Sequence, residues 1–347
     1  MAGRLVVNEG VSPPGWDDQL RAVGGTIFHC SAWAEYVAAE QRNVTPLFLQ
    51  LVEHDARPLA FALAFHERSR RRLLAAFSGR VWLDSRPVAV GEDDAAAERT
   101  MLERVEGLAR QLGAVKLSVG SYASPDRPPA LEALGYTPAR RFEFEFDLRR
   151  SDAVLLQAMG DGRRRGLAKA RRSGVTVVDL DTETGLREMR RLEAVASARV
   201  VQRGGPRFGY TGDPAGDPVR VLLARGVGRL VGAVVDGQLV SVDLFTRFGS
   251  LIYSTHGGHD ARALETRASS LVFWEVLRRS RDEGAERFSL GGCSAAAVRE
   301  DSSEHGVYEY KKAFGATCLP CTSGEKVLRP VTQRVMATLH RLARRTG

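Results

Sequence analysis

The amino-acid sequence predicts an α/β protein of two tandem domains, each a mixed, mostly antiparallel sheet flanked by helices. The chain has 347 residues, which is more than a single hydrophobic core usually holds. The expected order of elements, a strand meander followed by helix, strand, helix and strand, occurs twice along the chain. The second copy closes with strand, helix and strand in about 40 residues, the length of a parallel crossover unit. We therefore expect domains at 1–147 and 148–329, with a basic amphipathic helix at 330–347.

The composition is that of a soluble globular protein, because 44% of the residues are hydrophobic and 27% are charged. No apolar run is long enough to span a membrane. The N-terminus, MAGRLVVNEG, lacks the hydrophobic region of a signal peptide. We expect a cytoplasmic monomer.

The charge balance points to phosphate-rich partners. The formal net charge is +8, and a basic surface attracts nucleic acid through charge and counterion release. The alternative is an arginine content that reflects a high-GC genome, because many basic proteins bind no nucleic acid.

The first copy of the element order follows a loop-rich stretch of 27 residues. A helix begins at Ser31, which can cap it, and Trp33, Tyr36 and Val37 face inward. The remaining elements are expected as strands at 46–52, 58–66 and 73–77, a helix at 93–112, a strand at 115–119, a short helix at 129–134 and a strand at 142–148.

The second copy begins with two helices and contains a strong hairpin turn at Asp236-Gly237. A loop at 200–217 is rich in glycine and proline. The expected helices are 152–159, 163–173, 185–198, 217–224 and 267–283, and the expected strands are 174–180, 228–235, 238–246, 250–256 and 288–290.

The terminal segment carries an apolar stripe of Val331, Val335, Leu339 and Leu342 beside several arginines. This pattern is typical of a helix packed on a core with a solvated face. Contact with tRNA or with a membrane surface is the alternative.

The cysteines and histidines predict no metal site. Cys318-Leu-Pro-Cys321 is a CxxC pair, but no second pair lies at zinc-ligand spacing. The proline and the surrounding strand-like residues also disfavour a redox motif, so we expect reduced thiols. His256-Gly-Gly-His259 is interpreted as a turn at a strand end.

One run of residues carries a family resemblance. Tyr310-Lys311, two variable positions and Phe314-Gly315 match the end of the Fem-family signature, and Tyr253 and Gly291-Gly292 precede them in the family's order. The chain thus resembles the Fem aminoacyl-tRNA-dependent aminoacyltransferases from about residue 28 to residue 314. The resemblance implies two tandem GNAT-like acyltransferase domains.

The resemblance also implies roles for particular residues. Lys311 takes the position of the family's functional lysine and is the candidate catalytic residue. Lys312 could substitute for it. The candidate substrate-binding residues, including those of the glycine-rich loop, are Arg203, Arg207, Tyr210, Tyr253, Tyr308 and Lys312.

The second helix of the second domain, RRRGLAKARRS, is very basic. Its charges are too many for one face, so some must be exposed, either as a solvated face or as a contact with a tRNA backbone. The candidate tRNA-binding residues are Arg163, Arg164, Arg165, Lys169, Arg171 and Arg172.

The implied reaction is attack of an acceptor amine on the ester of aminoacyl-tRNA, the co-substrate. The ester is already activated, so no cofactor is expected. The acceptor is a peptidoglycan precursor or a small peptide-like metabolite. Many Fem members carry a phosphate-binding lysine one turn after the tryptophan at position 33, and its absence here favours a small acceptor. No general base stands out among Asp243, His305 and Glu309.

Two other functions are compatible with the sequence. An acyl-CoA-dependent GNAT enzyme would hold the pyrophosphate on a glycine-rich loop, but the equivalent stretch, Arg262 to Ala268, contains no glycine. A non-catalytic RNA-binding protein would explain the charge but not a transferase architecture.

Overall fold

A computed structural model describes residues 3–68, 79–91, 94–202, 204–205 and 207–334. The chain forms two compact units, one of residues 1–141 with 320–347 and one of residues 142–319. The polypeptide leaves unit 1 within β7 (Thr137–Asp147) and returns to it within β13 (Thr317–Val327). The end of β13 therefore belongs to unit 1, whereas the expected second domain extended to residue 329.

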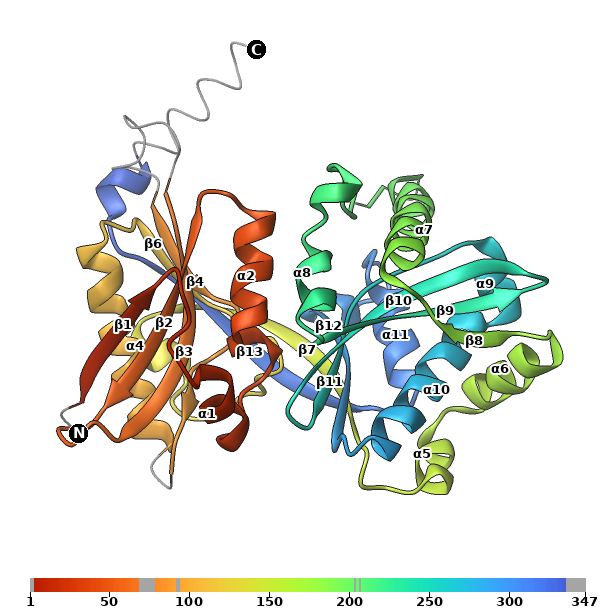
Figure 1. Cartoon of the computed structure of the whole chain (residues 1–347), viewed down its shortest axis with the longest axis horizontal. Coiled ribbons are helices and arrows are strands. Elements are labelled where there is room, and N and C mark those ends of the chain that lie inside the picture. The colour runs from red at the N-terminus through yellow and green to blue at the C-terminus, as the bar shows by residue number, and fades with distance from the viewer. Residues whose placement is uncertain (1–2, 69–78, 92–93, 203, 206, 335–347) are drawn as a thin grey trace, which may run out of the picture. The chain divides into compact units, whose positions relative to one another are not determined.

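Unit 1 contains a mixed sheet in the order β1-β2-β3-β4-β6-β13 (Figure 1). Its neighbouring strands are antiparallel except for β4 and β6, which run parallel. β5 pairs with β3. The bounds are β1 Arg4–Glu9, β2 Val44–Val52, β3 Pro58–Glu67, β4 Arg80–Leu83, β5 Val88–Ala89 and β6 Lys116–Val119.

The side chains of β2 point alternately to the two faces of the unit 1 sheet, and a helix covers each face. Leu47, Leu49 and Leu51 belong to a buried cluster with α4 (Asp94–Gln111). Phe48 points the other way and lies edge-on to Trp16 of α1 (Trp16–Ala22), with ring centroids 5.2 Å apart. Because successive strand side chains face opposite sides, one sheet receives helices on both faces. The remaining helices are α2 Ser31–Glu40, η1 Ile27–His29 and η2 Leu131–Leu134.

The first 27 residues, expected to be loop-rich, contain the short elements β1 and α1. Ser31 does not cap α2. The Cys30 sulfur accepts from the Trp33 amide instead, while the Ser31 hydroxyl donates to Asp17. The strand expected at 73–77 lies outside the described residues.

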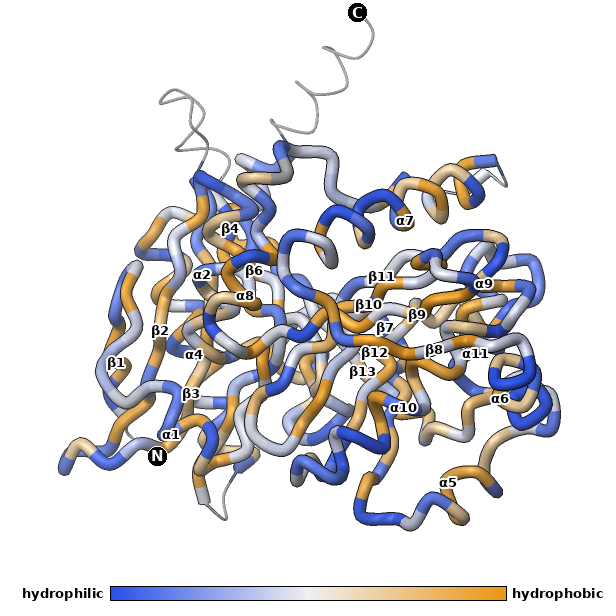
Figure 2. The backbone as a smooth tube through the Cα atoms, turned by 45° about the vertical axis from the view of Figure 1, so that its right-hand side comes forward, coloured by the Kyte–Doolittle hydropathy of each residue, from blue (hydrophilic) through white to orange (hydrophobic). Residues whose placement is uncertain are grey.

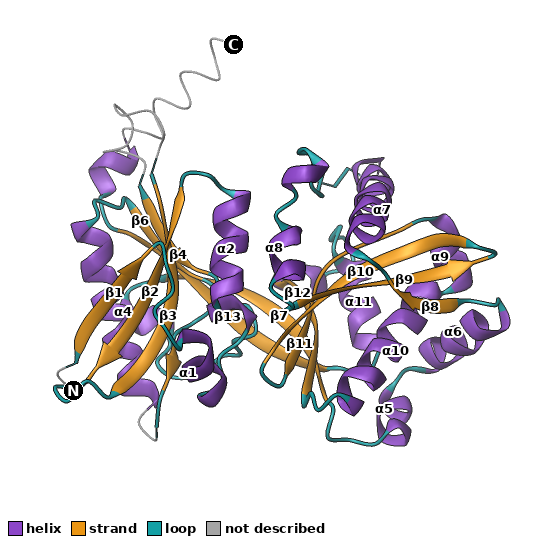
Figure 3. Cartoon of the chain, viewed as in Figure 1, coloured by secondary structure: helices purple, strands orange, loops and turns teal. Residues whose placement is uncertain are grey.

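The strands of unit 2 lie in the order β7-β12-β11-β10-β9-β8 (Figure 3). The strands from β8 to β11 pair antiparallel, and β11 pairs with β12 in parallel. The bounds are β8 Thr176–Asp179, β9 Gly228–Val235, β10 Gln238–Phe248, β11 Leu251–His259 and β12 Arg287–Ser294.

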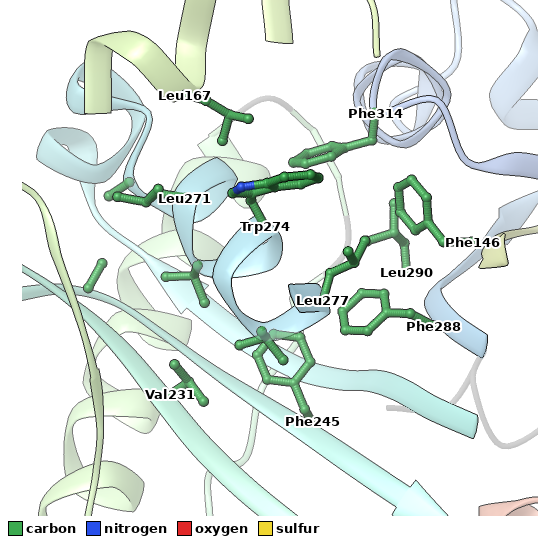
Figure 4. Close-up of a cluster of buried hydrophobic side chains, with 14 of the residues drawn as sticks. Phe146, Leu167, Val231, Phe245, Leu271, Trp274, Leu277, Phe288, Leu290 and Phe314 are labelled. Carbon is green, nitrogen blue, oxygen red and sulfur yellow. The ribbon is translucent and has the colours of Figure 1, made fainter. Parts of the chain in front are cut away.

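Helices cover both faces of the unit 2 sheet. α7 packs along β11 and β10, and α10 packs against β9, β10 and α6. Aromatic and aliphatic side chains around Trp274 fill the core on the α10 side, including Phe288, Phe314 and Leu167 (Figure 4). The helix bounds are α5 Asp152–Ala158, α6 Asp161–Arg172, α7 Thr182–Gln202, α8 Val219–Ala224, α9 Ala261–Thr266, α10 Ala268–Asp282 and α11 His305–Ala313, with η3 at Pro214–Gly216 and η4 at Ala295–Val298.

The predicted α/β class, with mixed and mostly antiparallel strands flanked by helices, is confirmed. The helix expected at 330–347 lies mostly outside the described residues. α9 was not expected from the sequence, which assigned no element between the strand at 250–256 and the helix at 267–283. Within the described residues, no helix is both long and apolar enough to cross a membrane.

Candidate functional site

The parallel strands β11 and β12 meet over only a short stretch. Three residue pairs join them, ending at Tyr253 opposite Ser289, although both strands continue beyond that point. Gly291 adopts φ +71°, a left-handed conformation that favours glycine. The Ser289 hydroxyl accepts a hydrogen bond from the Gly291 amide at 3.0 Å. The turn at Gly291 therefore directs β12 away from β11 beyond the paired residues.

Lys311 reaches this turn from the last part of α11. Its Nζ donates to the Gly292 carbonyl oxygen at 2.9 Å, and it lies 3.5 Å from where a Cβ on Gly291 would stand. Lys312 points elsewhere, with its Nζ 5.6 Å from the centroid of the Tyr308 ring. The structure thus separates the two lysines, and it places Lys311 at the strand ends.

Tyr253 and Glu143 complete the surroundings of Gly291. The Tyr253 hydroxyl donates to Glu143 Oε1 at 2.8 Å, and both residues are buried. The Tyr253 ring lies 3.7 Å from the position of a Cβ on Gly291. A cation, a phenol and a carboxylate from three elements therefore gather at the end of β12.

The aromatic residues of the signature pack inward. Tyr310 and Phe314 contact Phe273 of α10, with centroid distances of 6.5 and 6.0 Å. The Arg163 guanidinium lies 4.0 Å from the centroid of the Tyr310 ring, and burial lowers the pKa of this arginine. Their packing fixes the orientation of α11, and hence that of Lys311.

The basic side chains of α6 differ in their contacts with the rest of unit 2. Arg163 is half-buried against Tyr310, and Arg164 donates to the carbonyl oxygens at the end of α5. Arg171 lies 3.6 Å from Glu275. The other candidate tRNA contacts are exposed, and Figure 2 shows α6 as strongly hydrophilic; they are Arg165, Lys169 and Arg172.

The glycine-rich loop forms a pocket of about 330 Å³ against α7. Arg207 and Tyr210 line it, as do Phe208 of the loop and Ser197 of α7. The Ser197 hydroxyl accepts from the Phe208 amide at 2.9 Å, which anchors the loop on the helix. Arg203 lies outside the described residues.

A charged network beneath Tyr210 was not found from the sequence. Arg190 of α7 donates to both carboxylate oxygens of Asp217, at 2.7 and 2.8 Å, and to Glu193 at 2.5 Å. Burial raises the pKa of Glu193, because its effect exceeds the opposing effect of the Arg190 charge. The Arg190 guanidinium also faces the Tyr210 ring at 5.1 Å. No sequence signal marks this network, because Arg190 and Asp217 are 27 residues apart.

Asp243 is a buried acid on the α10 side of β10. Its Oδ2 accepts from the Ser241 hydroxyl at 3.0 Å. Desolvation by burial raises the pKa of its carboxyl to about 7. His305, in contrast, makes a 3.1 Å hydrogen bond with the Ala297 carbonyl oxygen, and Glu309 is exposed.

The segment between β11 and α10 is helical rather than a glycine loop. Asp260 caps α9 by accepting from the Ala263 amide at 2.9 Å. Arg267 then takes φ +62° between α9 and α10. The first turn of α10 therefore follows another helix directly.

The two cysteines of the CxxC pair lie on β13, with Cys318 exposed and Cys321 buried, and they form no disulfide with each other. No group of three or more metal-ligating side chains occurs within the described ranges.

Comparison with known proteins identifies the architecture. Residues 161–312 match a family model described as an acetyltransferase (GNAT) domain. The crystal structure of FemX aligns with a TM-score of 0.74 over 94% of this chain and 99% of FemX, at 15% identity. The chain is a GNAT-fold protein with the architecture of FemX. The tandem GNAT domains and the Fem-like fold predicted from the sequence are thereby confirmed.

Other solved structures share the fold of this Fem-like chain. L-PGS from Bacillus licheniformis aligns with a TM-score of 0.55 over 97% of this chain and 98% of its own, at 12% identity. A tandem GNAT protein from the clavulanic acid biosynthesis pathway gives 0.51 over 93% and 98%, at 14% identity. A search of curated protein sequences found no match.

Proposed function

We propose that this Fem-like chain transfers the aminoacyl group of an aminoacyl-tRNA to an amine of a small peptide-like acceptor. The acceptor is an antibiotic-type metabolite or a peptidoglycan precursor, and the product is an amide. The observation that carries the proposal is the Lys311 ammonium at the diverging ends of β11 and β12. In the Fem resemblance this lysine belongs to the reaction centre.

The chemistry needs few protein groups. The acceptor nitrogen attacks the ester carbonyl carbon, and a tetrahedral oxyanion forms. The C–O bond to the tRNA ribose then breaks, and the proton lost by the amine ends on the ribose oxygen. A fixed cation beside the developing oxyanion stabilises it more than it stabilises the neutral ester, so the Lys311 ammonium lowers the barrier.

Lys311 also favours this donor over acyl-CoA. Its Nζ lies 3.5 Å from the position of a Cβ on Gly291, just beyond the paired residues of β11 and β12. The capped helix α9 precedes α10 in place of a loop whose free amides could hold a pyrophosphate. Both features support an ester donor that reaches the strand ends without a bound coenzyme.

Acyl-CoA-dependent N-acyl transfer is the second candidate, because the matched domain model is described as an acetyltransferase. Donor dependence separates the two. The protein is incubated with total tRNA charged with labelled amino acids and candidate acceptor peptides, with and without RNase, and with acetyl-CoA in parallel. RNase-sensitive label transfer is expected, and transfer from acetyl-CoA alone would overturn the proposal.

Replacing the lysine tests its role. Lys311→Ala should lower the transfer rate by about 10²-fold or more, as loss of one oxyanion donor does, and leave the melting temperature nearly unchanged. Lys116→Ala, which removes an exposed ion pair with Glu325, is the matched control and should keep the full rate. A Lys311→Ala protein with an intact fold and full activity would refute the assignment.

The exposed charges of α6 provide a separate test of tRNA binding. Changing Arg165, Lys169 and Arg172 to Gln together should weaken tRNA binding and reduce the slope of log K against log salt by up to about 3, roughly one per lost phosphate contact. An unchanged slope would remove α6 from the tRNA contact. Binding of RNA without transfer in any assay would instead support an RNA-binding protein.

A further inference from the structure

The parallel strands of unit 1, β4 and β6, also end at a polar cluster. Their paired residues finish at Leu83 opposite Val119. Backbone bonds continue the ladder, from the Gly120 amide to the Leu83 carbonyl at 2.7 Å and from the Tyr122 amide to the Asp84 carbonyl at 3.1 Å. A Cβ on Gly120 would overlap the Asp84 carbonyl, so only glycine allows this approach. The two loops are therefore fixed against each other.

Asp84 begins the loop after β4, and its carboxylate has neutral partners. Trp33 Nε1 donates to Oδ2 at 2.8 Å, and the nearby Trp82 indole also favours the charged form of the carboxyl. Within the described residues Asp84 forms no ion pair. Arg80 acts on it only through longer-range charge and is itself paired with Glu67. A partly buried carboxylate without a counter-charge is costly unless a cation reaches it.

Aromatic rings adjoin this carboxylate. Phe28 and Tyr36 each lie 4.8 Å from Trp33, and Tyr122 stacks on Phe28 at 5.1 Å. Tyr122 is 41% exposed, so the array reaches the surface. The rings of this region already accept cations, because the Arg141 guanidinium lies 4.4 Å from the centroid of the Tyr122 ring. Electron-rich ring faces attract positive charge.

Two buried hydroxyls in the same loops lack partners. Ser85 follows Asp84, and Ser121 follows Gly120; they are 3% and 1% exposed. Neither Oγ makes a hydrogen bond within the described part of the chain. Buried polar groups in proteins are nearly always paired, so these loops retain unused hydrogen-bonding capacity.

We propose that this cluster, named here the Asp84 site, binds an organic ammonium group through the Asp84 carboxylate and the neighbouring aromatic rings. If the proposed function holds, the acceptor is an amine-bearing, positively charged molecule, because a nucleotide diphosphate would bring negative charge to an uncompensated carboxylate. The ammonium would supply the counter-charge, and the rings would exclude water around it.

The indoles of Trp33, which donates to Asp84, and of nearby Trp82 provide the readout. The chain has four tryptophans, and their indole ¹⁵N–¹H resonances can be assigned with Trp33→Phe and Trp82→Phe variants. The full-length protein is titrated with n-pentylammonium, with n-pentanol as the neutral match and with uridine diphosphate as the anionic probe. Trp274, in the core of unit 2, is the internal reference.

Pentylammonium should shift the Trp33 and Trp82 signals in a saturable way and leave Trp274 unmoved. Pentanol should need at least about tenfold higher concentration, and uridine diphosphate should cause no shift at these two indoles. Asp84→Asn should weaken ammonium binding by about tenfold to a hundredfold, since a charged hydrogen bond is lost. Asp18→Asn, at an exposed ion pair, should bind as the wild type does.

Melting temperatures show whether each variant folds. If Asp84→Asn does not, Tyr122→Ala replaces it and should weaken ammonium binding several-fold. Equal shifts from pentanol, stronger binding of uridine diphosphate, or an ammonium shift retained in folded Asp84→Asn would overturn the proposal. So would no shift at any concentration. The titration contains no tRNA, so it tests the Asp84 site separately from the proposed function. If ammonium binds but no tRNA-dependent transfer is found, only the proposed function is refuted.

Discussion

The buried carboxyl of Asp243 should make stability depend on pH. Its side chain is on the α10 side of β10, with the Ser241 hydroxyl as its hydrogen-bond donor. The neighbouring phenol of Tyr310 has a pKa raised by burial, so it stays neutral at ordinary pH. The pKa of Asp243 is raised from 3.8 to about 7. The folded state therefore binds a proton that the unfolded state releases.

The sign and size of the effect follow from linkage. A raised pKa favours folding when the group is protonated, so this contribution is present below pH 3.8 and is lost as pH rises towards 7. A shift of about three units corresponds to at most about 4 kcal/mol of unfolding free energy. Asp243→Asn keeps an acceptor for Ser241 and removes the ionisation.

The assay compares wild type and Asp243→Asn by thermal unfolding from pH 5 to pH 8. The melting temperature of the variant should rise relative to wild type as pH increases, by about 2–4 °C per kcal/mol for a unit of this size. Asp55→Asn, on an exposed turn, should follow the wild-type profile. Parallel profiles for wild type and Asp243→Asn would refute the reasoning.

Further substitutions test contacts within unit 2. Tyr253→Phe removes the hydroxyl that donates to buried Glu143, so it should lower the stability by about 1–3 kcal/mol and lower the melting temperature. An unchanged melting temperature would mean that this hydrogen bond adds nothing to stability. Gly258→Ala would place a Cβ against the backbone of α7 and should destabilise the protein strongly. Gly162 lies in α6, and a Cβ added there would meet no other atom. Gly162→Ala should therefore be neutral or stabilising by up to about 1 kcal/mol. Equal melting temperatures for these two alanine variants would contradict the close packing of α7 on β11.

The sequence predicted the fold well because most elements have a local signal. The hairpin at Asp236-Gly237 and the crossover through α10 were placed within a few residues. α1 and β1 were missed because their short segments lie among glycines and prolines. α9 was missed because six residues are too few for a periodic pattern.

The site was harder to predict because its geometry depends on contacts that are distant in sequence. Adjacent Lys311 and Lys312 cannot be separated by pattern, and only the packing of Tyr310 and Phe314 decides which one reaches Gly292. Arg163 was predicted as a tRNA contact, but its guanidinium lies over Tyr310. Its role in binding tRNA stays a prediction, as do those of the other basic residues.

The two units use the same local design with opposite charge. Each contains a parallel strand pair, β4 with β6 in unit 1 and β11 with β12 in unit 2. A glycine follows the paired residues in each unit, Gly120 in unit 1 and Gly291 in unit 2. In unit 1 the loops stay hydrogen-bonded beyond the pair, and a carboxylate stands among aromatic rings. In unit 2 the strands diverge, and an ammonium stands at the opening. A closed anionic site is suited to recognising a cation, whereas an open cationic site is suited to a reaction that develops negative charge. If both proposals hold, acceptor recognition belongs to unit 1 and the reaction to unit 2, and the Asp84 and Lys311 variants test each part separately.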